Sequence, residues 1–277
     1  MAQHSADELA QAVVARLADC PNPRFKQVMT GLIEHAHAFV RDVDLKPDEW
    51  MAAIQFLTAT GQMCDEVRQE FILLSDTLGV SALVEFLTHS GSDGSTENTV
   101  LGPFFVPGSP ERAFGETMLE EQDAGDRVVI RGRITDGDGA PIAGVKLDAW
   151  QNATNGFYAC QQPDEQSATN LRGIYRSDAD GCYEMRTVRP VPYPIPDNGP
   201  AGKLLKDNGR NWWRPGHTHL WVSAPGFKDL ITHVFDTASE FLDTDAVFGV
   251  RPSLARRFVV DANGELVATF DIILDRS

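Results

Sequence analysis

The sequence predicts an α+β protein: a helical N-terminal part followed by a mainly antiparallel β-sandwich. Apolar residues first recur at helical intervals, and later they alternate with polar neighbours. Asp-Gly and Asn-Gly pairs, which favour tight turns, recur between the alternating segments of the later part. We place the boundary where the period changes, which gives a helical domain over 1–95 and a sandwich domain over 96–277.

Helix signals follow one another through the first domain. Ser5 and Glu8 have the spacing of a capping box, which predicts a helix start. The apolar stripe from Phe25 to Val43 predicts a second helix. Pro47 suits the first position of a third helix, with acidic residues in its first turn. Two shorter helices are expected afterwards, one through Val67, Phe71 and Leu74 and one around Leu83 to Leu87.

Strand signals begin after His89 and a cluster of turn formers over 91–95. Alternating segments predict strands over 128–134, 145–149, 258–260 and 267–273. Hairpin-type turns are predicted at Asp138-Gly139, Asp180-Gly181 and Asn263-Gly264. Prolines punctuate the segment Arg189–Pro196, so it cannot run as a central strand and is expected to be a stiff loop at the end of the sandwich.

Composition excludes several functions. The formal net charge of −16 repels phosphate backbones, so we expect no nucleic-acid partner. No apolar run reaches the roughly 18 residues of a membrane span, and Met1–Ala12 lacks the apolar centre of a signal peptide. The four cysteines form no Cys-x-x-Cys pair, which predicts reduced thiols. These features together predict a cytoplasmic protein.

A His-x-His pair on a predicted strand is the sharpest local signal of chemistry. His217 and His219 would point the same way, so both imidazoles could reach one metal ion. Histidines also fall two apart as ordinary packed or surface residues, and a metal site needs further ligands. His233 is the remaining histidine of the sandwich. His35 and His37 share the spacing, but on a helix they lie about 200° apart.

Tyrosines are the next candidates. Tyr175 and Tyr183 flank the Asp180-Gly181 turn and are typical of ordinary strand residues. Tyr158 follows a predicted strand, and Tyr193 is held between prolines. Each alone is also compatible with a packed aromatic.

The order and spacing of Tyr158, Tyr193, His217 and His219 resemble those of the intradiol ring-cleavage dioxygenases. The resemblance covers nearly the whole chain and extends through Thr96–Phe104, Asp148–Gln151, Arg189–Pro196 and Ser223–Gly226. It implies that the two tyrosines and two histidines bind one non-haem Fe(III) per subunit. Fe(III) favours anionic oxygen donors, and two phenolates offset much of its charge. The ion would lower the pKa of both tyrosines far below the free value of about 10.

The resemblance also implies an activity in the degradation of aromatic rings. The substrate would chelate iron through two adjacent hydroxyls while Tyr193 leaves the metal and takes a proton. Both atoms of O2 would enter the ring-cleaved product. Arg214 would stabilise negative charge on the reacting ring, although it could also form a surface ion pair. His233 stands where many relatives carry glutamine and would donate a hydrogen bond towards the reaction centre, although it could be an ordinary polar strand residue.

Two segments, Phe71–Gly79 and Phe241–Val250, resemble hydroxyquinol 1,2-dioxygenases more than catechol enzymes. Cleavage of hydroxyquinol would give 3-hydroxy-cis,cis-muconate, that is, maleylacetate. Leu73 and Asp76 would line the ring pocket, where a buried carboxylate could pair with the third hydroxyl. Asp76 could instead cap a helix start. The apolar walls would come from Val100, Leu101, Gly102, Pro103, Phe104, Ile195, Pro196 and Val250.

Two other functions remain open. The first is a catechol or chlorocatechol 1,2-dioxygenase, which keeps the chemistry and changes the ring. The second is a transthyretin-like binding module, because Asp136–Val145 and Asp178–Gly181 resemble such sandwiches. The resemblance to the dioxygenases implies a homodimer paired through the N-terminal helices, with an interface that often holds a lipid.

Overall fold

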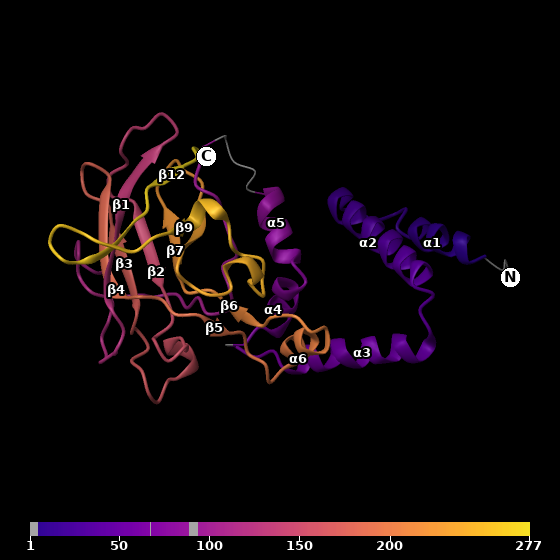
Figure 1. The fold of residues 1–277 in the computed structure, drawn as a ribbon. Helices are drawn as coiled ribbons and strands as arrows, with labels where there is room; N and C mark the ends of the chain where they lie inside the picture. The colour runs from indigo at the N-terminus through magenta and orange to yellow at the C-terminus, as the bar shows by residue number, and fades with distance from the viewer. Residues whose placement is uncertain (1–4, 67, 89–93) are drawn as a thin grey trace. The chain divides into compact units, whose positions relative to one another are not determined.

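The computed structural model describes residues 5–66, 68–88 and 94–277, and the chain divides between Ala59 and Thr60 into two compact units. The first unit contains α1 (Ala6–Ala15), α2 (Pro23–Asp42) and most of α3 (Pro47–Gln62) (Figure 1). The second contains α4 (Glu70–Thr77), α5 (Val80–Thr88), α6 (Pro200–Asp207) and all the strands. The boundary predicted between residues 95 and 96 was placed where helical signals give way to strand signals, so it differs from the division after Ala59.

The capping signals set the helix starts. Ser5 and Glu8 form the predicted capping box of α1, and α2 starts at Pro23 behind an Asn22 side chain that accepts a hydrogen bond from Phe25 N. Pro47 is the first residue of α3, as predicted. The apolar stripe of α2 has no buried residue within this chain. Predictions that involve His4, Val67 and His89 fall outside the described residues.

The predicted sandwich is confirmed, and it consists of two five-stranded sheets and a short ribbon. One sheet has the order β10-β11-β1-β12, with β4 also paired to β1, and the other has the order β3-β2-β7-β8-β9. The ribbon pairs β5 with β6. Most pairs are antiparallel; β1 with β11, β1 with β12 and β8 with β9 are parallel. The strands are β1 (Arg127–Asp136), β2 (Lys146–Trp150), β3 (Arg172–Arg176), β4 (Cys182–Val188), β5 (Tyr193–Pro194), β6 (Trp213–Arg214), β7 (His217–Ser223), β8 (Leu230–Asp236), β9 (Ala255–Arg256), β10 (Val259–Val260), β11 (Leu266–Thr269) and β12 (Ile272–Leu274).

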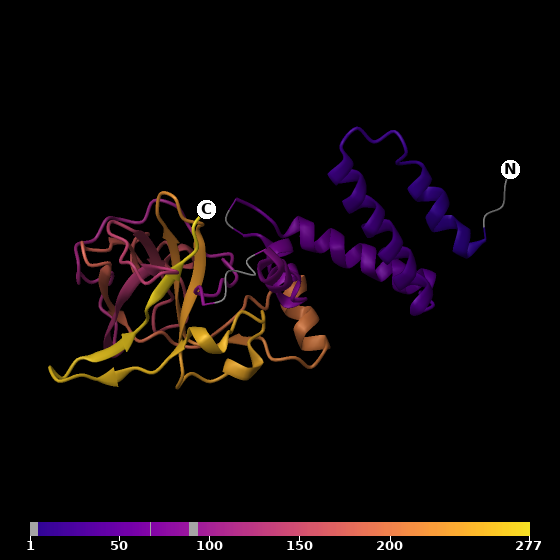
Figure 2. The same cartoon turned by 90° about the horizontal axis from the view of Figure 1, so that it is seen from above.

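Two of the three predicted turns close an antiparallel pairing. Asn263-Gly264 connects the antiparallel strands β10 and β11, which project from the sandwich in Figures 1 and 2. At Asp138-Gly139 the end of β1 folds back on itself: Thr135 pairs antiparallel with Pro141, and Ile142 N donates to Ile134 O at 3.0 Å. The turn at Asp180-Gly181 was also expected to join a hairpin, but β3 and β4 on either side of it lie in different sheets. The turn chemistry is nevertheless present, because Asp178 Oδ1 accepts hydrogen bonds from the backbone of Asp180 and Cys182. The Asp180-Gly181 turn therefore lies where the chain passes from one sheet to the other.

The core lies between the two sheets. Its largest fully buried side chains include Tyr175, Tyr183, Phe235 and Phe270. Both tyrosine hydroxyls donate to backbone carbonyls, Tyr175 to Glu116 and Tyr183 to Phe270, which fits their assignment as structural residues. All four cysteines are free.

Within the described ranges, no single helix is long and apolar enough to cross a membrane. Only α4 and α5 taken together have the necessary length and composition, and they are bent by 77° relative to each other.

Candidate metal centre

Strand β7 carries the two histidines at its start. Because they are two residues apart on a strand, His217 and His219 point to the same side, and their Nε2 atoms lie 3.1 Å apart. The shared direction of the two imidazoles, predicted from the His-x-His spacing, is therefore confirmed. Pro215 O lies 2.7 Å from His217 Nδ1, a contact that fixes the ring and turns Nε2 towards the neighbouring imidazole.

Two tyrosines reach the same point from separate loops. Tyr158 precedes the 3₁₀ helix η1 (Ala159–Gln161), where its backbone N–H donates to Gln161 Oε1. Tyr193 is placed by the ribbon, because β5 and β6 set it directly opposite Arg214. Tyr158 Oη lies 3.0 Å from His219 Nε2 and donates to Tyr193 Oη at 3.2 Å. We call Tyr158, Tyr193, His217 and His219 the donor cluster.

The donor cluster is buried, and burial sets its protonation. Its four side chains are between 0% and 3% exposed. Burial lowers the pKa of both imidazoles well below the usual value, so they are neutral and their lone pairs are available. Burial also raises the pKa of both phenols, so a phenolate would form here only beside a cation.

The donor set fits a metal ion. Ligand atoms about 2.1 Å from one ion lie about 3 Å from their nearest neighbours, which matches the spacing seen here. Neutral imidazoles combined with phenol oxygens suit a hard ion such as ferric iron better than a soft one. The Nδ1 atom of His219 is buried without a hydrogen-bond partner among the described residues. Its ring is supported instead by Trp150, stacked at 4.7 Å and 11°.

His233 extends the histidine cluster from β8. It pairs across the sheet with His219, and the ligand atoms of His217, His219 and His233 lie within 4.8 Å of one another. The ring of His233 stacks on that of His217 at 4.6 Å and 20°, so it presents a face to its neighbour. Burial lowers its pKa well below the usual value. Stacking of a neutral ring favours a supporting role over that of a further ligand.

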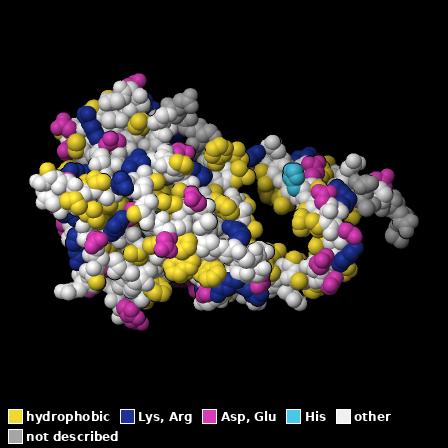
Figure 3. All heavy atoms as spheres, in the orientation of Figure 1, with side chains coloured by type: hydrophobic (Ala, Val, Ile, Leu, Met, Phe, Trp, Pro, Cys, Tyr) yellow, Lys and Arg dark blue, Asp and Glu magenta, His cyan; other side chains and the backbone are white. Residues whose placement is uncertain are grey.

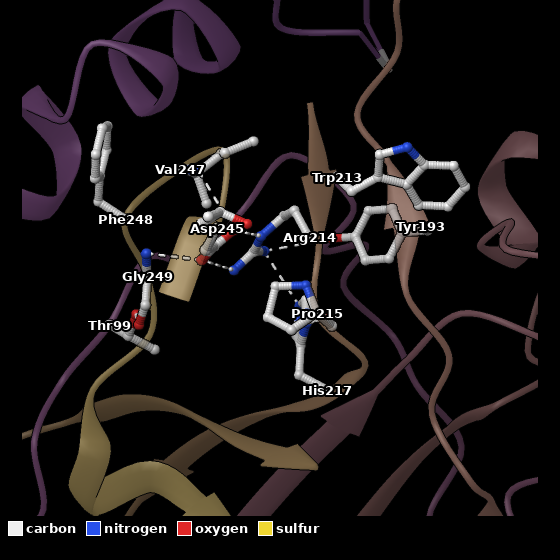
Figure 4. A network of polar contacts seen from close by, with 12 residues as sticks. Thr99, Tyr193, Trp213, Arg214, Pro215, His217, Asp245, Val247, Phe248 and Gly249 are labelled. Carbon is white, nitrogen blue, oxygen red and sulfur yellow. Dashed lines mark hydrogen bonds and ion pairs between the residues drawn. The ribbon is translucent and has the colours of Figure 1, made fainter. Parts of the chain in front are cut away.

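Arg214 brings one positive charge to the donor cluster. Its Nη1 donates to Tyr193 Oη at 3.4 Å and lies 3.2 Å from His217 Nε2 (Figure 4). Its side chain is 3% exposed, so the alternative of a surface ion pair is wrong. Burial alone would lower the pKa of Arg214, but Asp245 and Tyr193 outweigh burial and raise it, so the guanidinium is always charged.

Comparison with known proteins identifies the family. Residues 100–276 match the family described as dioxygenase, and residues 22–96 match the catechol dioxygenase N terminus. The chain belongs to the intradiol ring-cleavage dioxygenases. It is 45% identical to 6-chlorohydroxyquinol 1,2-dioxygenase of Cupriavidus pinatubonensis over 99% of both chains. It is also 45% identical to hydroxyquinol 1,2-dioxygenase of Rhizobium sp., over 90% of this chain and 84% of the relative.

A solved structure agrees with these relatives. The hydroxyquinol 1,2-dioxygenase of Pseudomonas putida DLL-E4 superposes with a TM-score of 0.92 at 44% identity, over 98% of this chain and 99% of that chain. This chain is therefore an intradiol dioxygenase, and the alternative of a non-catalytic transthyretin-like module does not apply.

A cavity of about 150 Å³ lies beside Tyr158 of this dioxygenase, because Cys160 and Gln161, which follow Tyr158 in the chain, line it. Phe104, in its wall, stacks on Tyr158 at 4.6 Å. The volume matches that of a cavity of about 150 Å³ known to hold one benzene ring in an engineered protein core. Its walls come from Arg68, Gln69, Glu70, Leu73, Pro103, Phe104, Cys160, Gln161 and Pro196. We call this cavity the ring pocket.

Four of the predicted substrate-binding residues line the ring pocket, namely Leu73, Pro103, Phe104 and Pro196. The other predicted residues lie around it. Leu101 packs with the aromatic rings of the donor cluster, and a Cβ added to Gly102 would lie 3.4 Å from the His219 ring. Val250 lines a separate cavity beside Asp245. Val100 and Ile195 are buried.

Asp76 lies one turn beyond Leu73, in the last turn of α4. Its side chain is 2% exposed and is hydrogen-bonded by Ser81. Burial is the main cause that raises its pKa, while Ser81 and the charge of Arg214 act in the opposite direction. Asp76 lies inside α4, and α5 starts at Val80, so Asp76 is not the residue that precedes the start of either helix.

Sequence reasoning missed three supporting residues. Trp150 stacks on His219, Asp245 pairs with Arg214, and Glu70 accepts a hydrogen bond from Ala201 N at the start of α6. Trp150 and Asp245 lie inside segments that carried the resemblance, but a linear motif does not show which side chain each one meets. Glu70 had no sequence signal.

Proposed function

We propose that this intradiol dioxygenase binds ferric iron through Tyr158, Tyr193, His217 and His219 and cleaves hydroxyquinol between its adjacent hydroxyl-bearing carbons. The observation that carries the proposal is the donor cluster, which brings two phenol oxygens and two imidazole nitrogens to one buried point. The product would be 3-hydroxy-cis,cis-muconate, the tautomer of maleylacetate.

The protein would supply position and charge, and the metal would supply Lewis acidity and a template for the two substrate oxygens. Burial keeps the imidazoles neutral, so both can bind the ion without losing a proton. The aromatic rings of Phe104 and Trp150 pack around the ligands and exclude water from them.

Tyr193 would act as a ligand and as a proton acceptor. When a substrate hydroxyl takes its place, the phenol oxygen can receive the substrate proton, and burial favours the neutral phenol that results. Tyr158 donates a hydrogen bond to that same oxygen and lies against His219 on its other side. This arrangement favours Tyr158 as the ligand that stays in place.

Arg214 and His233 would act on the reacting ring from the side of the strands. Arg214 carries the fixed positive charge beside Tyr193, where negative charge develops during cleavage. His233 would contribute a hydrogen bond from a neutral ring. Both of its nitrogens are buried without a hydrogen-bond partner of normal geometry among the described residues.

The choice of hydroxyquinol rests on α4. Leu73 lines the ring pocket, and Asp76 offers a buried carboxylate one turn further along. A site that pairs with a third hydroxyl leaves its polar group unpaired when catechol binds, so it discriminates against catechol. Relatives named hydroxyquinol 1,2-dioxygenase at 41–45% identity support this choice.

We propose a homodimer that forms through the N-terminal helices. Within the first unit, large apolar side chains of α2 and α3 are exposed, and Figure 3 shows yellow side chains over both helices. Measurement of the mass in solution tests the dimer, and mass spectrometry of the native protein tests for a bound lipid at its interface. The four free cysteines support a reducing, cytoplasmic location.

Oxygen uptake with hydroxyquinol and catechol side by side tests the function. Controls without enzyme are needed because hydroxyquinol oxidises spontaneously. A kcat/KM that is clearly higher for hydroxyquinol, with maleylacetate as product, is expected. A preference for catechol would keep the reaction and overturn the proposed substrate.

A further inference from the structure

The buried carboxylate of Asp245 accepts hydrogen bonds from the side of Arg214 that faces away from the donor cluster. Asp245 Oδ1 accepts from Arg214 Nε at 3.1 Å, and Oδ2 accepts from Nη2 at 3.4 Å (Figure 4). A guanidinium has donors on three nitrogens in one rigid plane. With Nε and Nη2 engaged, Nη1 is the nitrogen left to face Tyr193 and His217.

The backbone around Asp245 is arranged to hold this carboxylate still. Its Oδ2 accepts from Gly249 N at 2.9 Å, and its Oδ1 accepts from Val247 N at 3.4 Å. The Thr99 hydroxyl donates to Gly249 O at 2.6 Å and so ties this turn to a distant part of the chain. A Cβ added to Gly249 would lie 2.9 Å from Arg214 Nη2, so only glycine lets the turn approach this closely.

We propose that Asp245 is the positioning residue that aims Arg214 Nη1 at the substrate side of the donor cluster. The proposal rests on the proposed function, in which Arg214 stabilises charge on the reacting ring. Arg214 carries the charge, and Asp245 fixes the orientation in which that charge reaches the ring. No contact between Asp245 and substrate is part of this role.

The burial of the pair explains why a flexible side chain needs such a partner. Arg214 is 3% exposed and Asp245 is 2% exposed at the side chain, so neither charge has water as an alternative partner. Since a buried ion pair contributes little net stability, we assign this one the role of specifying geometry. Arginine has many rotamers, and the two-point contact with Asp245 selects one of them.

Asp245→Asn in the iron-loaded enzyme tests the role. The variant keeps the size and one acceptor oxygen but removes the charge that holds Arg214. We expect kcat for hydroxyquinol to fall about 30-fold with KM little changed, because the affected charge acts in the transition state. Asp243→Asn, an exposed acid in the preceding helical turn, is the matched control and should behave like the wild type.

A double-mutant cycle separates positioning from an independent effect. In an Arg214→Gln background, Asp245→Asn should cost almost nothing further, because the group that it positions is gone. An additional 30-fold loss in that background would overturn the proposal. So would a single variant with wild-type kcat.

A second readout does not depend on iron or turnover. In the metal-free protein, the Arg214 Nε–H should give a dispersed, slowly exchanging NMR signal, assigned by its loss in Arg214→Lys. Asp245→Asn should collapse this signal towards the range of exposed arginines, whereas Asp243→Asn should leave it in place. An unchanged signal in Asp245→Asn would overturn the proposal.

Thr99→Val covers the case in which Asp245→Asn does not fold. It removes the hydroxyl bond to Gly249 and leaves the ion pair itself in place. We expect a loss of kcat of about 5-fold and a broadened Arg214 signal; wild-type behaviour in both would overturn the proposal. If the wild type turned over neither ring, the proposed function would fail, and the NMR signal would still report whether Asp245 fixes Arg214.

Discussion

The donor cluster and the ring pocket lie side by side in one unit, but they are built differently. The donor cluster is polar, and its side chains come from β7, the β5–β6 ribbon and the loop before η1. The ring pocket is walled on one side by the short helix α4 and on the other by Pro103, Phe104 and Pro196. Under the proposed function, the reaction would be set by residues fixed in the sandwich, while the choice of ring would depend on how α4 is held.

The two parts also differ in how their side chains are supported. In the donor cluster, each ring contacts another ring of the cluster or an aromatic neighbour. On α4, Asp76 depends on burial and one hydrogen bond from Ser81. A change in the donor cluster should therefore abolish the reaction on every ring, whereas a change on α4 should alter the preference among rings.

The largest effect is expected from His219→Ala. Loss of one ligand should release iron and reduce turnover of hydroxyquinol and catechol equally, to below about 1% of wild type. Iron content and oxygen uptake measure this. His35→Ala, in a pair with the same spacing on α2, is the matched control. If His219→Ala kept its iron and still turned over one ring faster than the other, the donor cluster would not control the reaction on every ring.

Asp76→Ala should have the next largest effect, and it should be selective. Loss of a hydrogen bond to a buried carboxylate is expected to lower kcat/KM for hydroxyquinol about 30-fold and to change catechol much less. Steady-state kinetics on both rings measure the difference. Equal losses of kcat/KM for hydroxyquinol and catechol would show that Asp76 does not recognise the third hydroxyl.

Glu70→Gln should loosen α4 without touching the donor cluster. Glu70 is fully buried; it accepts from Arg68 Nε at 2.9 Å and from Ala201 N at 3.1 Å, so it caps α6 from a different helix. Weakening these charge-assisted bonds should cost about 2 kcal/mol and lower Tm by about 5 °C. Exposed Glu66→Gln is the control, and a Tm equal to that of the control would contradict the capping role.

The smallest effect is expected from Asp76→Asn, which removes a buried carboxylate and so changes the stability of the folded protein. Because burial raises the pKa of Asp76, its charged form is less favourable in the folded protein than in the unfolded chain. This penalty is present at neutral pH and disappears as the pH falls through the folded pKa. Asp76→Asn should therefore raise Tm by about 2 °C near pH 8, with a smaller gain near pH 5. A lower Tm at both pH values would contradict this account.

The sequence predicted local features best. The capping box of α1, the proline starts of α2 and α3 and the shared face of His217 and His219 all depend on neighbouring residues. The sheet to which each strand belongs was less predictable, because an Asp-Gly turn can either close a hairpin within one sheet or connect strands of two different sheets. This explains the error at Asp180-Gly181.

Contacts between distant residues were beyond sequence reasoning. Asp245 meets Arg214 across 31 positions, and Glu70 meets Ala201 across 131. Nothing in the spacing of these residues pairs them, because the folded sandwich brings them together. The resemblance to a known family supplied the identities of the donor cluster, and the structure supplied the partners that support it.

One titration tests the central claim for both parts together. Hydroxyquinol and catechol would each be added without oxygen to the iron-loaded protein while the visible phenolate-to-iron absorption is followed. We expect a red-brown protein whose absorption shifts at clearly lower concentrations of hydroxyquinol than of catechol. A colourless iron-loaded protein would contradict the assignment of the two tyrosines as ligands, and equal midpoints for the two rings would contradict the role of α4.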